Sequence, residues 1–393
     1  MRVCLYLEDR WIVSADITCL MVAFNAGATI YRAIDSALSQ VDQMILVDDG
    51  SGDNTVEVAA RAGGKRIQVI RFDCNRGIGA ARQAAVNACQ TGVACWLDAD
   101  DIWLPGRIEK LFPFIQSGAD YVFDESQLVD YCSNRNCLHK KTTDLRFPDF
   151  IRQKDGLLHQ FGRNYLPTIG VPMARLSALK ETGYNPDLKQ AEDNEHLLKA
   201  IYRNKSVQLS PGISYREYGR DDSTSRNLEK QNACLALSCR FIDQSELIKR
   251  VVESSLPRLE QFVILSLFLV RVRNWKGLLN LVASFSFYEQ EGDSRTTWMR
   301  CFFAGVAEYQ VGNIAGASAL FEKALSIEES AELYNNLGVC LERAGNDGSA
   351  LFQQALGLKS GYLDARRNAE KNGQHLTAVP LRKLAYRGEY SFR

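Results

Sequence analysis

The chain has 393 residues, more than one hydrophobic core usually supports, so its length predicts two or three domains. Apolar residues make up 46% and charged residues 24%, which is typical of a folded globular protein. Lys plus Arg equals Asp plus Glu at 47 each, which excludes a chain-wide electrostatic attraction to nucleic acid or to an anionic membrane.

The cysteines and the apolar runs predict a cytoplasmic protein. Eleven cysteines are scattered without the spacing of a disulfide framework or a zinc site, and the closest pair, Cys132 and Cys137, is interpreted as loop thiols rather than a bridge or a metal site. The first residues, MRVCLYLEDRWIVSA, lack the apolar core of a secretion signal. The run Phe262–Val270 is too short to span a membrane and predicts a buried helix; peripheral membrane association stays open.

From Asp16, short β-rich runs alternate with helical segments, a pattern typical of an α/β fold with a mostly parallel sheet. Ile30, Ile34 and Leu38 recur every four positions, so they share one helix face that is expected to pack on the sheet. The expected strands are Ile17–Phe24, Met44–Val47, Ile67–Phe72 and Val93–Leu97.

Four acids follow these strands: Asp48, Asp49, Asp98 and Asp100. In open sheets of this kind, ligands bind beyond the carboxyl ends of the strands, and a divalent cation would offset the repulsion between gathered carboxylates. Asp98 and Asp100 are two residues apart, so in an extended segment both can face one Mg²⁺ or Mn²⁺ while Asp101 points away. The alternative is that Asp100 and Asp101 only cap a helix that begins near Leu104.

The chain after residue 226 is predicted to be helical, and part of it repeats. Gly305 and Gly338 are 33 residues apart, as are Gly312 and Gly345, and the spacing resembles that of tetratricopeptide (TPR) repeats. The second copy is two residues short. We therefore expect domains at 1–226 and 297–393, joined by a helical linker or irregular hairpins at 227–296, with a closing helix at 363–372 and a groove for a protein partner.

Five motifs in the first half resemble, in the same order, those of glycosyltransferase family 2, whose members have the GT-A fold. The resemblance covers residues 16 to about 225. The motifs are Val22–Asn25, Leu46–Ser51, Asn75–Arg82, Trp96–Asp101 and, after the turn Gly183–Asn185, Ala191–Asp193. The resemblance implies a GT-A nucleotide-sugar-binding domain, followed here by the all-α TPR-like region.

The resemblance also implies the role of each site residue. Asp193 would be the catalytic base, unless it only caps the helix that begins there, and Asp100 with Asp98 would hold the Mg²⁺ or Mn²⁺. Tyr218 stands where many members of the family carry a metal-binding His, which leaves the third metal ligand open. The nucleotide sugar would be bound by Asp48 or Asp49 at the base, by Asp98 at the ribose, and by Asn75, Gly77 and Arg82.

By this resemblance the protein is expected to be an inverting glycosyltransferase. A sugar would move from a nucleotide donor, most commonly UDP in the family, to a hydroxyl of a glycan, a lipid-linked sugar or a protein. One alternative is a catalytically degenerate nucleotide-sugar-binding scaffold that recruits partners through the repeats. The retained Asp98, Asp100 and Asp193 favour the enzyme. A dinucleotide site is the other alternative, and Arg82 at the position of its third glycine disfavours it.

Overall fold

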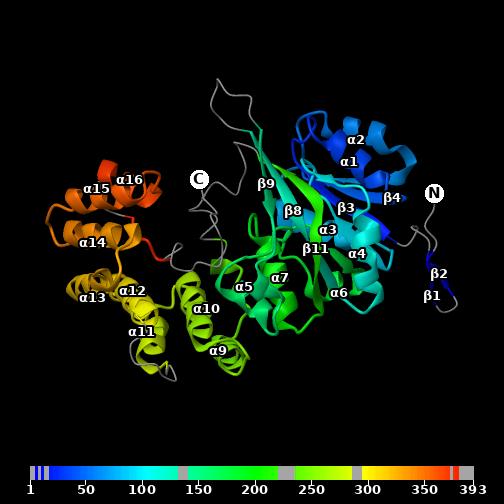
Figure 1. Ribbon diagram of the computed structural model, residues 1–393. Helices are drawn as coiled ribbons and strands as arrows, with labels where there is room; N and C mark the ends of the chain where they lie inside the picture. The colour runs from blue at the N-terminus through cyan, green and yellow to red at the C-terminus, as the bar shows by residue number, and fades with distance from the viewer. Residues whose placement is uncertain are drawn as a thin grey trace. The chain divides into compact units, whose positions relative to one another are not determined.

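The structure is a computed structural model that describes residues 5–7, 10–12, 17–131, 140–219, 234, 236–285, 294–371 and 375–379. The chain divides into two compact units, seen in Figure 1. The N-terminal unit comprises residues 1–152 and 164–242, and the helical unit comprises residues 153–163 and 243–393. Cys132 and Cys137 lie outside the described residues, and the cysteines within them are free.

The division between the units differs from the boundary expected at residue 226. Residues 153–163 pack with the helical unit, where α5 (His159–Gly162) lies against α10 (Arg258–Arg271). His159 Nε2 is 3.0 Å from Glu260 Oε2, and Arg271 donates to the carbonyl of Gly162. No local pattern in the sequence indicates that this short segment belongs with helices that lie a hundred residues later.

The N-terminal unit contains a nine-stranded sheet in the order β5-β4-β3-β6-β10-β8-β11-β7, with β9 paired to β8. The expected parallel strands are confirmed in β5-β4-β3-β6, but the sheet is mixed beyond them, because β10 runs antiparallel to both of its neighbours. The strands are β3 Ile17–Ala23, β4 Gln43–Asp48, β5 Ile67–Arg71, β6 Val93–Trp96, β7 Ile102–Trp103, β8 Tyr121–Tyr131, β9 Lys140–Leu145, β10 Met173–Arg175 and β11 Val207–Tyr218. A separate hairpin pairs β1 (Leu5–Leu7) with β2 (Arg10–Ile12).

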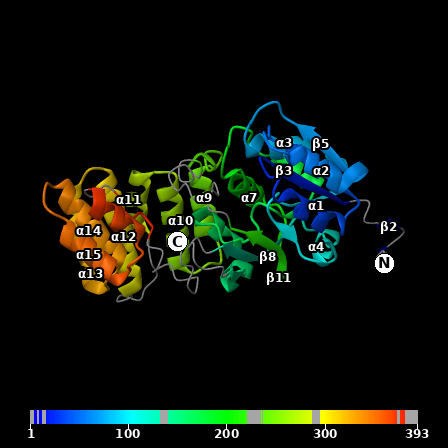
Figure 2. The same ribbon diagram turned by 90° about the horizontal axis from the view of Figure 1, so that it is seen from above.

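Helices cover this sheet because their apolar residues fall on one face. Ile30, Ile34 and Leu38 are buried, as their spacing predicts. Figures 1 and 2 both show β3 lying between α1 and α3. The helices of this unit are α1 Ile30–Leu38, α2 Thr55–Gly63, α3 Ile78–Ala88, α4 Arg107–Gln116, α6 Leu176–Thr182 and α7 Glu192–Tyr202, with short 3₁₀ turns at Gly64–Arg66 and Asp149–Arg152.

The helical unit consists of consecutive helices that pack mainly on their neighbours along the chain, as α12 does on α13 and α14 on α15. The apolar run near residue 262 is a buried helix, as expected, and no described helix has the length and apolar character needed to cross a membrane. The helices are α5, a 3₁₀ turn at Gly156–Leu158, α9 Gln244–Val252, α10, α11 Trp275–Ser284, α12 Ser294–Gln310, α13 Ile314–Ile327, α14 Ala331–Arg343, α15 Ser349–Leu358 and α16 Leu363–Lys371.

The two copies of the 33-residue pattern make the same contact. A Cβ placed on Gly305 would lie 2.6 Å from the ring of Phe321, and one placed on Gly338 would lie 2.5 Å from the ring of Phe352. Glycine is therefore required in α12 and α14 so that an aromatic ring of the next helix can approach the backbone. The second aromatic residue comes two positions earlier relative to its glycine, yet the contact is preserved.

Candidate functional site

The loops after β3 and β4 are joined by hydrogen bonds at the carboxyl edge of the sheet. Asn25 has a positive φ of 50°, its N–H donates to Ser51 Oγ at 2.9 Å, and its side-chain oxygen accepts from the N–H of Gly52. Gly50 has a φ of 77°, and a Cβ there would lie 2.8 Å from the backbone nitrogen of Asn75. Phe24 stands beside these loops with 48% of its surface exposed. Phe24 is thus half exposed at its place in the chain next to two loops that hydrogen bonds hold together.

Asp48 and Asp49 are both buried, but they make different contacts. Asp48 pairs with Arg71 at 3.3 Å, and its Oδ1 has no hydrogen-bond partner among the described residues. Asp49 accepts the backbone N–H groups of Arg76 and Gly77 at 2.7 and 3.0 Å. Asp49 therefore holds the loop that contains the predicted Asn75 and Gly77, and Asn75 itself is exposed.

The glycines at the start of α3 allow a close approach of the chain rather than a dinucleotide. A Cβ on Gly79 would lie 2.2 Å from the carbonyl oxygen of Asn185 and 2.6 Å from that of Leu188. Gly77 has a φ of 95° and faces Lys189. Because residues 185–189 cover the N-terminus of α3, the space that a pyrophosphate would need there is already filled.

Arg82 is the centre of the candidate site. Its side chain is only 3% exposed, its Nε is 3.0 Å from Glu192 Oε1, and one terminal nitrogen is 3.2 Å from Asp98 Oδ1. The other terminal nitrogen donates to the carbonyl of Gly170 at 2.7 Å. A Cβ on Gly170 would lie 3.2 Å from Arg82 and 3.5 Å from Asp193 Oδ2. One guanidinium thus connects β6, α7 and the segment before β10.

The acids around Arg82 have altered proton affinities. Partial desolvation, and then the charges of Asp100 and Asp193, raise the pKa of Asp98, although its side chain is 43% exposed and Arg82 opposes the shift. Burial, followed by the charge of Asp193, raises the pKa of Glu192. Burial also raises the pKa of Asp193, against the opposing charge of Arg82. A carboxylate with a raised pKa takes up a proton more readily, which suits a general base.

Asp101 has a structural role that separates it from Asp98 and Asp100. Its carboxylate accepts the Tyr215 hydroxyl and the backbone N–H of Tyr218, each at 2.9 Å. The Tyr215 oxygen in turn accepts the backbone N–H of Asp98. The capping alternative is wrong, because α4 begins only at Arg107, after Gly106 in the left-handed region, and Asp101 bonds β11 instead. The segment is a turn in which the N–H of Asp101 donates to the carbonyl of Asp98 at 3.2 Å, so the extended conformation expected for residues 98–101 is not found.

Tyr218 lies beside the Asp98–Asp100 segment, where it stacks with Arg32 of α1. The Arg32 guanidinium lies 3.8 Å from the centre of the Tyr218 ring and donates to the backbone carbonyl of Asp100. Among the described residues, no cluster of three or more His, Cys, Asp or Glu side chains could hold a metal ion.

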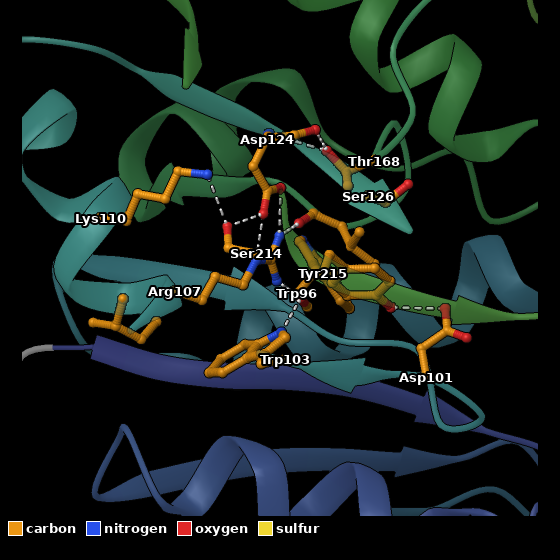
Figure 3. A network of polar contacts seen from close by, with 12 residues as sticks. Trp96, Asp101, Trp103, Arg107, Lys110, Asp124, Ser126, Thr168, Ser214 and Tyr215 are labelled. Atoms are coloured by element: carbon orange, nitrogen blue, oxygen red, sulfur yellow. Dashed lines mark hydrogen bonds and ion pairs between the residues drawn. The ribbon is translucent and has the colours of Figure 1, made fainter. Parts of the chain in front are cut away.

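A second buried arginine, Arg107 at the start of α4, packs against the same sheet and was not predicted from the sequence (Figure 3). Its Nε and one terminal nitrogen bind the two oxygens of Asp124 at 3.0 and 2.9 Å, and Ser214 donates to the same carboxylate. Arg107 also donates to the carbonyls of Trp96 and Val171. Both charged side chains are completely buried, so this cluster anchors α4 to the sheet and is closed to a ligand.

Glu217 is a further acid on the β11 side of the site that was not predicted from the sequence. It bonds Ser126, and burial, opposed by that hydrogen bond, raises its pKa to about 7. Asp98 and Asp100 add to the shift through their charges. The sequence shows that Glu217 precedes Tyr218. It does not indicate that β11 pairs with β8 or that Glu217 bonds Ser126, 91 residues earlier.

Comparison with known proteins shows which family and which fold this unit is similar to. Residues 18–169 match the family Glycosyl transferase family 2. The succinoglycan biosynthesis protein ExoU of Rhizobium meliloti is 29% identical over 221 residues, which are 53% of this chain and 64% of ExoU. The chain thus spans slightly less than two thirds of that relative.

Two further similarities are informative. The Escherichia coli enzyme WfaP, named a UDP-Glc:alpha-D-GlcNAc-diphosphoundecaprenol beta-1,3-glucosyltransferase, is 29% identical over 104 residues, or 26% of this chain and 41% of WfaP. The crystal structure of Staphylococcus aureus TarS 1-349 in complex with UDP-GlcNAc has a TM-score of 0.52 at 17% identity, covering 79% of this chain and 92% of TarS 1-349. The sheet with the Arg82 site therefore has a GT-A-like fold, and its residues 18–169 are similar to glycosyl transferase family 2.

Proposed function

We propose that the N-terminal unit transfers a sugar, with inversion, from a nucleotide-sugar donor to an acceptor hydroxyl. The observation that supports this most strongly is that Arg82 joins Asp98, at the end of β6, to Glu192 at the start of α7, with Asp193 beside them. Arg82 and Glu192 come from motifs that place them 110 positions apart in sequence. A cluster of acids with raised pKa values, one of them partly exposed, is typical of a catalytic site.

In this proposal Asp193 is the general base. It removes the proton of the acceptor hydroxyl while the acceptor oxygen bonds to the anomeric carbon and the bond from that carbon to the nucleotide diphosphate breaks. The raised pKa of Asp193 favours its protonation in this step. Arg82 holds Asp98 and Glu192 in place and reduces the repulsion among the acids.

The donor is proposed to lie over the loops after β3 and β4. The exposed ring of Phe24 offers a face on which the nucleotide base can stack, close to Asp49. Asp98 and Asp100 would hold Mg²⁺ or Mn²⁺, which would offset the charge of the diphosphate when bound. The two carboxylates supply oxygen ligands, which such a cation prefers. We favour UDP as the nucleotide, because the names of WfaP and of the TarS complex both contain UDP-linked sugars.

The acceptor is proposed to be a saccharide, free or linked to a lipid diphosphate. ExoU is named for the biosynthesis of succinoglycan, and WfaP for transfer to a lipid-linked GlcNAc. A role in polysaccharide biosynthesis follows from these relatives, and a lipid-linked acceptor would bring this protein to a membrane surface.

The experiment is a turnover assay with UDP-glucose and UDP-GlcNAc, using GlcNAc-diphosphoundecaprenol as the first acceptor and Mn²⁺ as the metal. The expected result is acceptor-dependent release of UDP with one of these donors, abolished by Asp193→Asn. Tight donor binding without turnover of any acceptor in a wider panel would contradict the proposal and support a nucleotide-sugar-binding scaffold. The Arg32–Tyr218 stack at the expected place of a metal-binding His is the observation that favours this alternative.

We also propose that α12–α15 are TPR-like hairpins that serve a protein partner. The support is the equivalent glycine-to-aromatic contact in both helix pairs, Gly305 to Phe321 and Gly338 to Phe352. In this arrangement α16 closes the array.

A further inference from the structure

A short extended segment of the chain, residues 375–379, lies against α14 and α16 in the helical unit. These two helices and α15 are the last three labelled in Figure 1. The segment belongs to no helix or strand, and it is held by side chains rather than by a backbone ladder. It is therefore bound in the way that a ligand peptide is bound.

Two asparagine side chains each bind both backbone groups of one residue in the segment. Asn368 accepts the N–H of His375 at 2.8 Å and donates to its carbonyl at 2.9 Å. Asn336 accepts the N–H of Thr377 at 2.8 Å and donates to its carbonyl at 2.9 Å. The bound residues alternate, as they do in an extended strand, and four backbone groups are recognised without regard to side-chain identity.

A third asparagine, together with the side chains that bind the Thr377 hydroxyl, completes the site. Asn335 donates to the carbonyl of His375 at 3.0 Å and accepts from Asn368 at 2.8 Å. Thr377 Oγ1 donates to Asp364 Oδ2 at 2.8 Å, lies 3.3 Å from the Asn335 amide and bonds the hydroxyl of Tyr362. The site thus recognises Thr377 through its hydroxyl group. A valine has a similar shape but could not make these hydrogen bonds.

The asparagines are exceptional within the repeat. Residues 33 positions before Asn335 and Asn336 are Phe302 and Phe303, which are completely buried among aromatic side chains. Asn335 and Asn336 are just as buried, and Asn368 is 1% exposed. Apolar residues would pack these positions, whereas buried amides are costly unless they are hydrogen-bonded. The bonds to residues 375–379 satisfy them, so the asparagines are explained by recognition of an extended backbone.

We propose that α14 and α16 form a binding site for an extended peptide with a threonine or serine at its centre. Residues 375–379 of the chain occupy this site in cis, and a partner peptide of the same character competes with them. The site uses none of the residues of the proposed sugar transfer, so the two proposals can be tested independently.

The direct test uses a chain that ends at Gln374 and a fluorescent peptide with the sequence of residues 374–380. The shortened chain should bind the peptide, and the full chain should bind it at least about tenfold more weakly, because its own segment fills the site. Asn336→Ala in the shortened chain should weaken binding by about tenfold, the loss expected for two hydrogen bonds. Asn346→Ala, which changes an exposed asparagine of the same unit, should leave binding unchanged.

A threonine-to-valine peptide should also bind about tenfold more weakly. A folded shortened chain without peptide binding, or equal binding by the Asn336→Ala variant, would overturn the proposal. If circular dichroism shows that the shortened chain is unfolded, amide hydrogen exchange in the full chain decides. The His375 and Thr377 amides should be protected, and excess peptide should accelerate their exchange by about tenfold. Unprotected amides, or protection that the peptide does not change, would refute the site.

Discussion

Two buried arginines of the N-terminal unit both contact Trp96, but their surroundings differ. The Arg82 guanidinium lies 4.6 Å from the centre of a Trp96 ring, and Arg107 donates to the Trp96 carbonyl at 3.1 Å. Asp124, the partner of Arg107, is completely buried, and both of its oxygens are bound. Asp98, a partner of Arg82, has 43% of its side chain exposed.

The comparison shows that a buried arginine paired with an acid does not by itself indicate function. Arg107 and Asp124 satisfy each other, so the pair fixes the packing of α4 on the sheet and offers nothing to a ligand. Arg82 instead holds two acids that repel one another, the buried Glu192 and Asp98, which solvent can still reach. Asp98 and Asp193, which are not fully buried and have raised pKa values, are two of the acids that we assign to the reaction.

The largest effect is expected from Asp193→Asn, which removes the proposed base but keeps the size of the side chain. Turnover should fall by about 10²–10⁴-fold, and the donor dissociation constant should stay within about twofold of the wild-type value. Turnover assays and donor titrations measure the two quantities. The matched control is Asp187→Asn, an exposed acid six residues earlier, which should not change turnover. An equal loss of donor binding in Asp193→Asn would contradict its assignment as the base.

Arg107→Met should instead reduce stability, because it leaves Asp124 buried without its partner. We expect the free energy of unfolding to fall by about 3–5 kcal/mol in chemical denaturation. Replacing both partners, by Arg107→Met with Asp124→Leu, should recover most of this loss. Lys205→Met, at a pair with the exposed Glu181, should cost less than about 1 kcal/mol. A loss below about 1 kcal/mol for Arg107→Met would remove the contrast between the two arginines.

Asp100→Asn should act on the donor rather than on the acceptor. If Asp100 helps to hold the cation, donor affinity in the presence of Mn²⁺ should fall by about 10–100-fold. Calorimetric titration of the donor measures this change. Donor affinity without metal serves as the control, and it should be the same for the variant and the wild type. A variant that keeps its full Mn²⁺-dependent affinity would show that Asp100 is not a ligand.

The smallest effect concerns Glu217 and depends on pH. Its pKa is raised from 4.5 to about 7, so between these values the folded state binds more protons than the unfolded state. Wild-type stability therefore falls as the pH rises through this range, and Glu217→Gln lacks this contribution. The variant should gain about 1 kcal/mol relative to the wild type between about pH 4.5 and about pH 8, measured by chemical denaturation. A difference that does not change with pH would contradict the shift.

Much of the site could be predicted from sequence because its motifs are local. The strands that lead to Asp48 and Asp98 follow from short apolar runs, and the structure confirms them in β4 and β6. The Arg82 cluster could be anticipated only through a family resemblance, since it joins residues 110 positions apart. The TPR-like assignment, the metal and the individual site roles remain predictions.

What could not be predicted depends on contacts between distant segments. The mixed part of the sheet arises from β10 and β11, whose alternation does not indicate direction. Asp101 accepts a hydrogen bond from Tyr215 of β11, which lies 114 residues later. The sequence near Asp101 instead resembles a helix cap, so it does not indicate this contact. The sequence alone does not distinguish the asparagines of α14 from other polar residues. Their role becomes clear only from their hydrogen bonds to residues 375–379.

The central claim is that the acids around Arg82 form a nucleotide-sugar site with a metal. It is tested most directly by calorimetric titration of the full wild-type chain with UDP-, GDP- and dTDP-sugars, each with and without Mn²⁺. We predict saturable binding of at least one sugar nucleotide, a UDP-sugar first, with affinity increased at least about tenfold by Mn²⁺. The absence of metal-dependent binding across the whole panel would contradict the account.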